Sequence, residues 1–210
     1  METTETQSVT VVGYKAFNNN MTCKNDFQYE VGKTYTINDD KVALCQSGFH
    51  FCMIPIDVLK YYDKKSKFAI IKATGKIIHD NDDNDKSVCS QITIEKLITL
   101  DELYKLTNGK IVRNNGTIEY YQNGKLHRED GPAIVCIDGD KYWYINGKLH
   151  RADGPAVEWA NGSKEWFKNG KWHREDGPAI EYANGDKYWY KNGKLHREDG
   201  PAIEDGPAIE

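Results

Sequence analysis

The sequence lacks any apolar stretch long enough to cross a membrane, and it has few cysteines. Its first residues show neither a basic segment nor a hydrophobic core, so we expect no signal peptide and no transmembrane helix. Five cysteines in 210 residues are too scattered for a disulfide scaffold, and free thiols are the simpler interpretation. We therefore expect a cytoplasmic protein that does not associate with membranes.

An excess of basic residues is also missing. The chain has 28 Lys and Arg against 32 Asp and Glu, a net charge of −4, so bulk nucleic-acid binding is not predicted. No arginine precedes Arg113, and four of the five arginines directly follow a repeated histidine. A hydrophobic content of 39% with 29% charged residues is typical of a folded protein.

Repetition is what the sequence has in abundance. Residues 123–134 return almost unchanged at 146–157, 169–180 and 192–203, with a constant step of 23 residues. Such a period is typical of repeat architectures, in which one short unit cannot bury enough surface alone and is stabilised by its neighbours.

Each repeat contains two turn signals. An Asn-Gly pair follows an aromatic run, which predicts a type I′ turn with positive φ at both residues. A second pair, such as Asp138 and Gly139, lies half a unit away, so the chain should zigzag as an antiparallel meander. The Asp-Gly-Pro sequence in the longer arm allows the bend that unequal arms require.

The turn of the last full unit predicts which side chains share a face. Tyr190 should lie opposite Leu195, and Trp189 opposite His196. Alternation along the strands then places Trp189 and His196 on one face and Arg197 on the other.

This pattern resembles a MORN repeat, whose 23-residue unit reads as an aromatic, a polar pair, Asn-Gly-Lys and then His. The resemblance covers about residue 108 to the C-terminus and departs from the family where Arg, not Gly, follows His. It implies an elongated, single-layer β-sheet used as a scaffold or interaction surface. We divide this half into a degenerate capping half-repeat at 108–122, repeats at 123–204 and a duplicated tail at 205–210.

The first half predicts a small mixed domain at residues 8–107, after a disordered start at residues 1–7. The whole chain is thus expected to be α+β. The predicted strands and helices, from β-prone runs and from helix start and stop signals, are strands at 9–12, 27–31, 34–37 and 68–73 and helices at 56–62 and 100–106.

One segment of this domain, residues 44–52, has a distinctive sequence. Together with residues 13–17 and 29–35 it resembles an uncharacterised N-terminal domain of bacteriophage and large DNA-virus proteins, over residues 11 to about 100. The resemblance implies a viral or prophage accessory protein in the host cytoplasm and supplies no activity.

The same segment, residues 44–52, suggests two chemical hypotheses. Cys45, His50 and Cys52 are zinc-ligand types, although their spacing matches no familiar zinc knuckle; the alternative is buried, inert cysteines. His50 with Tyr61 and Tyr62 is loosely similar to the core of ADP-ribosyltransferases, in which such residues grip nicotinamide or ribose. No acid stands in the required place, and the alternative is a core histidine satisfied by the backbone.

The acidic segment 79–85 hints at calcium but lacks the glycine and glutamate of an EF-hand loop, so a solvated loop is the alternative. We expect no cofactor.

The repeated His, Arg and Trp residues also allow two interpretations. In the first, each arginine pairs with the carboxylates that follow it and fixes the Asp-Gly-Pro bend. In the second, they form a periodic strip that contacts a protein or a small anionic ligand. The candidate residues are His127, His150, His173, His196, Arg128, Arg151, Arg174, Arg197, Trp143, Trp166 and Trp189.

Four near-equal copies of one surface favour binding over catalysis, so the sequence predicts a non-enzymatic recognition or scaffold protein. A protein partner is the first expectation, and copies could also associate through their sheet edges. The alternative function is an ADP-ribosyltransferase-like or nucleotide-binding activity in the first half. We expect the tryptophans to be structural and the arginines to be dispensable for folding.

Overall fold

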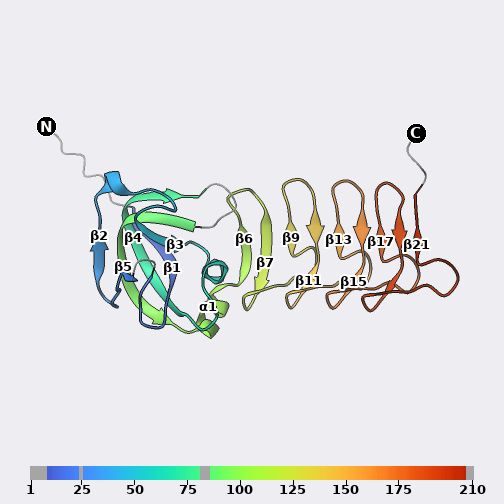
Figure 1. The fold of residues 1–210 in the computed structure, drawn as a ribbon, viewed down its shortest axis with the longest axis horizontal. Coiled ribbons are helices and arrows are strands. Elements are labelled where there is room, and N and C mark those ends of the chain that lie inside the picture. Colours follow the sequence, from blue (N-terminus) through green and yellow to red (C-terminus); the bar gives the residue numbers. More distant parts are fainter. Residues whose placement is uncertain (1–8, 24–25, 81–85, 207–210) are drawn as a thin grey trace. The chain divides into compact units, whose positions relative to one another are not determined.

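The computed structural model describes residues 9–23, 26–80 and 86–206, which fall into two compact units, with the division along the chain between Thr107 and Asn108 (Figure 1). Strands dominate both units, and the helical segments of the described residues lie in the first. This agrees with the expected mixed class, with β-structure strongly in excess. No helix in the described part of the chain is long and apolar enough to span a membrane.

The first unit is built on an antiparallel sheet that closes on itself. Its strand order is β2-β5-β3-β1-β4, and β4 also pairs with β5, so four of the five strands form a ring. Register shifts in the β4–β5 ladder let these long strands bend around the core. The strands are β1 (Val11–Phe17), β2 (Thr34–Thr36), β3 (Phe49–Cys52), β4 (Lys67–His79) and β5 (Lys86–Ile98).

Two apolar clusters stabilise this unit. The larger contains Phe17, Ile71 and Ile92, all fully buried. The smaller joins Phe68 of β4 to Leu103 and to two short helical elements. These elements are η3 (Pro55–Lys60), a 3₁₀ helix, and α1 (Leu100–Leu106), and a further 3₁₀ turn is η2 (Asp39–Lys41).

The helix predicted at 100–106 is confirmed as α1. Its N-cap, Thr99, accepts a hydrogen bond from the Glu102 amide, and the Glu102 carboxylate accepts one from the Thr99 amide. The α-helix predicted at 56–62 is instead the shorter 3₁₀ helix η3.

One strand prediction is wrong, and one long strand has no counterpart among the predictions. The strand predicted at 27–31 is absent, and that stretch holds only an isolated bridge between Thr22 and Gln28. The aromatic side chains of this stretch pack together, with the Phe27 and Tyr29 ring centroids 4.8 Å apart. Packing of the rings, and not pairing of the backbone with a neighbouring strand, therefore decides the path of the chain here. Strand β5, which pairs with three other strands, was not anticipated because its many polar residues conceal it.

The second unit repeats one arrangement along its length (Figure 1). Its main sheet is antiparallel, in the order β21-β18-β17-β14-β13-β10-β9-β7-β6, with β8 paired to β7. This sheet confirms the predicted antiparallel meander. Its strands are β6 (Gly109–Val112), β7 (Ile118–Gln122), β8 (Lys125–Leu126), β9 (Ile134–Val135), β10 (Lys141–Tyr142), β13 (Val157–Glu158), β14 (Lys164–Glu165), β17 (Ile180–Glu181), β18 (Lys187–Tyr188) and β21 (Ile203–Glu204).

Each later repeat also contributes a separate two-stranded hairpin, so the array is not one continuous ladder. The chain passes from the main sheet into the hairpin at the repeated tryptophan. The Trp143 amide donates to the Ala156 carbonyl, and the Trp143 carbonyl accepts from the His150 amide. The hairpins pair β11 (Tyr144–Ile145) with β12 (Lys148–Leu149), β15 (Phe167–Lys168) with β16 (Lys171–Trp172), and β19 (Tyr190–Lys191) with β20 (Lys194–Leu195).

The hairpin turns have the predicted geometry. Asn192 has φ 54° and Gly193 has φ 81°, the positive pair of a type I′ turn, and the three earlier Asn-Gly pairs are alike. Tyr190 lies opposite Leu195, which confirms the predicted hairpin register.

Candidate functional site

Each repeated arginine lies in a socket built by its own repeat. The guanidinium carbon of Arg174 is 4.0 Å from the centroid of the Trp166 ring. Its Nε donates to Asp176 Oδ1 at 3.0 Å, and its Nη1 donates to the Pro178 carbonyl at 3.2 Å and to the Glu181 carboxylate at 2.7 Å. Ring, backbone and carboxylate contacts therefore hold one side chain.

The Asp-Gly-Pro loop closes over this arginine. A Cβ on Gly177 would lie 3.0 Å from the Arg174 guanidinium carbon, so the glycine is needed for close approach. The hydrogen bond from Arg174 holds the pKa of Asp176 below its usual value. The first interpretation of the repeated arginines, pairing that fixes the bend, is confirmed. The same ring and aspartate contacts recur for Arg128, Arg151 and Arg197, with Tyr120 as the ring in the first copy.

The face assignment for the arginines is wrong. The sequence placed Arg197 on the face opposite Trp189, whereas its guanidinium carbon lies 4.0 Å from the centroid of that ring. The assignment assumed that regular alternation of side chains continues from the main sheet through the hairpin. The main-sheet strand instead ends at Tyr188, and the chain passes into the hairpin at Trp189.

The repeated histidines connect one repeat to the next. The His173 ring accepts a hydrogen bond at Nδ1 from the Asn192 amide at 3.2 Å. A ring nitrogen that accepts from an amide carries no proton, so the proton of the neutral ring is on Nε2, which lies 3.4 Å from Glu175. The equivalent bonds join His127 to Asn146 and His150 to Asn169.

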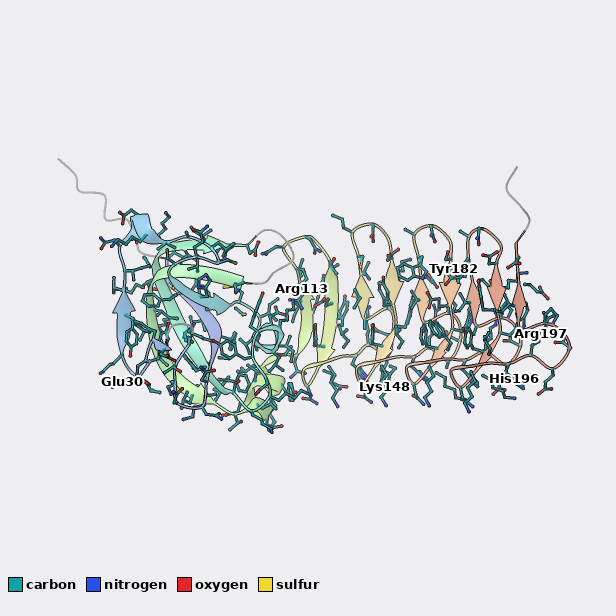
Figure 2. All side chains as sticks on the ribbon, in the orientation of Figure 1. Glu30, Arg113, Lys148, Tyr182, His196 and Arg197 are labelled. Carbon is teal, nitrogen blue, oxygen red and sulfur yellow. The ribbon has the colours of Figure 1, made fainter. Side chains whose placement is uncertain are left out.

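The two ends of the array differ in this contact. In the first repeat the side-chain oxygen of Asn108 accepts from the Asn123 amide at 2.7 Å and so takes the place of a histidine. In the last repeat the His196 side chain is 46% exposed, against 9% for His173. Figure 2 labels His196 and Arg197 in this final part of the array.

Lysines, which the sequence analysis did not single out, are exposed along the hairpins. Lys168 lies opposite Lys171, and Lys191 lies opposite Lys194. Like charges directly opposite each other weaken a hairpin. We call the exposed hairpin lysines the basic row, of which Figure 2 labels Lys148: Lys125, Lys148, Lys168, Lys171, Lys191 and Lys194.

The first unit contains a cavity of about 520 Å³. It lies where β1 and β3, paired only at Tyr14 and Cys52, separate. Lys15, which is 7% exposed, donates from Nζ to the His50 carbonyl at 2.7 Å. Burial lowers the pKa of Lys15. The cavity thus has a buried amine in its wall.

A tyrosine and a thiol meet in the same wall. The Tyr62 hydroxyl donates to Cys23 Sγ at 3.3 Å, and burial raises the pKa of Tyr62. Burial also raises the pKa of the nearby Cys89 thiol to about 12, so Cys89 is protonated at neutral pH. All five cysteines are free, as expected.

The predicted N-terminal candidates do come together at this cavity. His50, Tyr61 and Tyr62 line it, and so do Cys45 and Cys52. They do not form a zinc site: His50 Nε2 accepts from the Cys45 amide at 2.9 Å, and no three His, Cys, Asp or Glu side chains of the described residues form a group that could hold a metal.

The acidic segment considered for calcium lies mostly outside the described residues, since 81–85 are not among them. Sequence reasoning missed Lys15, whose only signal is a lysine in the middle of an apolar strand.

Comparisons with known proteins bear on the first unit. A family model described as a domain of unknown function (DUF7666) matches residues 11–106, so the first unit is similar to that family. The match leaves the repeat array outside it. A search of curated proteins found no match.

Proposed function

We propose that this protein is a non-enzymatic recognition protein whose repeat array is an elongated scaffold and whose basic row contacts a negatively charged surface of a protein partner. The proposal rests on one observation: Lys168 lies directly opposite Lys171 in its hairpin, and Lys191 lies directly opposite Lys194. Opposed like charges oppose hairpin stability, and local rules of this kind are most often broken where function requires it.

The repeated His, Arg and Trp side chains support this surface. Their contacts lie within the array, where they fix loops and join repeats, so they position the hairpins that carry the lysines. Lysine stems also lie against the next turn: a Cβ on Gly193 would be 3.6 Å from Lys171 Cβ. Successive repeats therefore present their lysines at a regular interval.

A protein partner fits the surrounding charges better than a nucleic acid. Glu175 and Glu198 are exposed beside the repeated histidines, and Glu198 lies 4.0 Å from Lys191 Nζ. Carboxylates interspersed with the lysines, in a chain of net charge −4, would repel a continuous polyanion. An individual acidic protein surface can match such a mixed pattern.

The resemblance of the first unit to a domain of phage and large DNA-virus proteins supports a role as an accessory protein in the cytoplasm of an infected cell. A small anionic ligand is the other kind of partner that the basic row could take.

Charge reversal of the basic row tests the proposal. In the full-length protein, Lys168, Lys171, Lys191 and Lys194 are changed to Glu. The variant should capture at least about tenfold less partner from nuclease-treated lysate, because repulsion replaces attraction at four positions. Carbodiimide, which couples amines to carboxylates, should crosslink partner acids to these lysines in the wild-type protein.

The matched control carries the same change in charge at Lys64, Lys65, Lys67 and Lys96 of the first unit, all exposed. It should capture the partner as the wild type does. Equal capture by both variants, or capture that disappears on nuclease treatment, would contradict the proposal. Circular dichroism confirms that both variants are folded.

A further inference from the structure

The cavity of the first unit lies where its sheet opens. Beyond the single pair Tyr14–Cys52, β1 and β3 separate, and the Lys15 amine spans the gap to the His50 carbonyl. A volume of about 520 Å³ is enough for a small organic molecule. Much of the lining is aromatic, including Phe27, Tyr29, Phe49 and Phe51.

The charged side chains that the structure describes in the cavity lining are all of one sign. Lys15 and Lys86 line it, and no Asp or Glu is found among the described residues of the lining, while His50 Nε2 accepts a hydrogen bond and so carries no proton. The Lys86 amine lies 4.4 Å from the centroid of the Tyr61 ring at the same cavity. From the described residues, an anion entering here would meet attraction and no carboxylate.

Lys15 itself is incompletely compensated. An ammonium group has three N–H donors, of which one donates to the His50 carbonyl and one to the Cys23 thiol, and neither acceptor carries a full negative charge. Tyr29 and Phe17 place their ring centroids 5.2 and 5.7 Å from Nζ, which favours a cation through the ring faces. Neighbouring thiols, Cys23 first, offset the effect of burial only in part. A buried ammonium without an anion is unfavourable, and a bound anion would supply the missing charge.

We propose that this cavity binds a small organic anion with an aromatic body, whose acidic group pairs with the Lys15 ammonium. The hydrogen bond to His50 alone explains a lysine that closes the gap between two strands. It does not explain why a cavity of this size has aromatic walls and two lysines, with no acid among the described residues of its lining. The proposal is independent of the function proposed for the repeat array.

Two dyes that share an aromatic body test this proposal in the full-length protein. The anion is 8-anilinonaphthalene-1-sulfonate, and the neutral analogue is N-phenyl-1-naphthylamine, which lacks the sulfonate. Fluorescence titration should find one saturable site for the anion, at least about tenfold tighter than for the neutral dye, since an ion pair with a buried amine is lost in the latter. Equal affinity for the two dyes would overturn the proposal.

A lysine substitution then locates the site. Lys15→Met should weaken binding of the anionic dye about tenfold and change binding of the neutral dye less than about twofold. The control, Lys96→Met on the exposed part of β5, should change neither. A folded Lys15→Met protein with unchanged affinity for the anion would overturn the assignment.

Because Lys15→Met could fail to fold, the wild-type protein provides an independent measurement. Nuclear Overhauser effects from the anionic dye should reach the ring protons of Phe27 and Tyr29. Effects confined to aromatic residues of the repeat array would show that the dye binds elsewhere and would refute the proposal.

Discussion

Arg174 stabilises its repeat by joining three groups that lie on both sides of it along the chain. The Trp166 ring precedes it, whereas Asp176 and Glu181 follow it, and all three contact one guanidinium group. The planar group can stack on a ring and donate in several directions at once, which an ammonium cannot. The arginine therefore acts as the centre of its loop, contrary to the expectation that it is dispensable for folding.

We predict that Arg174→Ala lowers the free energy of unfolding by about 1–3 kcal/mol, from loss of the charge-assisted hydrogen bonds and the ring contact. Arg174→Lys should restore only part of this loss, because it keeps the charge without the fork of donors. Urea denaturation followed by tryptophan fluorescence measures both. The exposed Lys171→Ala is the control, expected within about 0.5 kcal/mol of the wild type. An Arg174→Ala protein as stable as this control would show that the socket is not stabilising.

At this scale, distance along the chain decides what can be predicted. The pairing of Arg174 with Asp176 follows from the sequence because the two are near neighbours. The stacking on Trp166 does not, since it depends on where the chain leaves the sheet. The environment of Lys15 is less predictable still: its partners come from β3 and from loops that only the closed sheet brings to β1.

The hairpin is the element through which one repeat recognises the next. Its turn presents two backbone amides to the preceding repeat: Asn192 donates to the His173 ring, and Gly193 donates to the Trp172 carbonyl. The turn was predictable because Asn-Gly strongly favours positive φ at two successive residues. The contact across repeats was not, because periodicity alone does not say which groups of neighbouring units meet.

We predict that His173→Ala lowers the free energy of unfolding by about 1–3 kcal/mol, because it leaves the Asn192 amide without its acceptor. The last repeat contains the matched control. His196 has the same sequence surroundings but is far more exposed, so His196→Ala should change stability by less than about 0.5 kcal/mol. Equal losses in the two variants, measured by urea denaturation, would mean that the histidine acts within its own repeat.

In the closed sheet of the first unit, only some helices and strands could be predicted from the sequence pattern. Helix α1 was predictable because its capping residues, Thr99 and Glu102, are local signals. Strand β5 was not, because Ser87 and Ser90 are buried in it and weaken the alternation by which strands are recognised.

For the molecule as a whole, the 23-residue period predicts that repeats can be removed one at a time. Deleting residues 146–168 joins Ile145 to Asn169, so the Asn169 amide comes to the place that the Asn146 amide occupies and can donate to His127. The shortened array keeps every type of contact and loses one copy of each. It should fold, with a smaller urea m-value because less surface is exposed on unfolding.

The control for this deletion removes residues 146–157, about half a repeat. It joins Ile145 to Glu158, so the chain loses the Asn-Gly turn of the hairpin and no amide remains in place to meet His127. Far-ultraviolet circular dichroism and urea denaturation should show a cooperative transition for the whole-repeat deletion and a loss of array structure for the half-repeat deletion. Contacts between adjacent repeats are sufficient for this difference between the two proteins. Loss of cooperative unfolding in both proteins would mean that the repeats are stabilised by contacts longer in range than those between adjacent units.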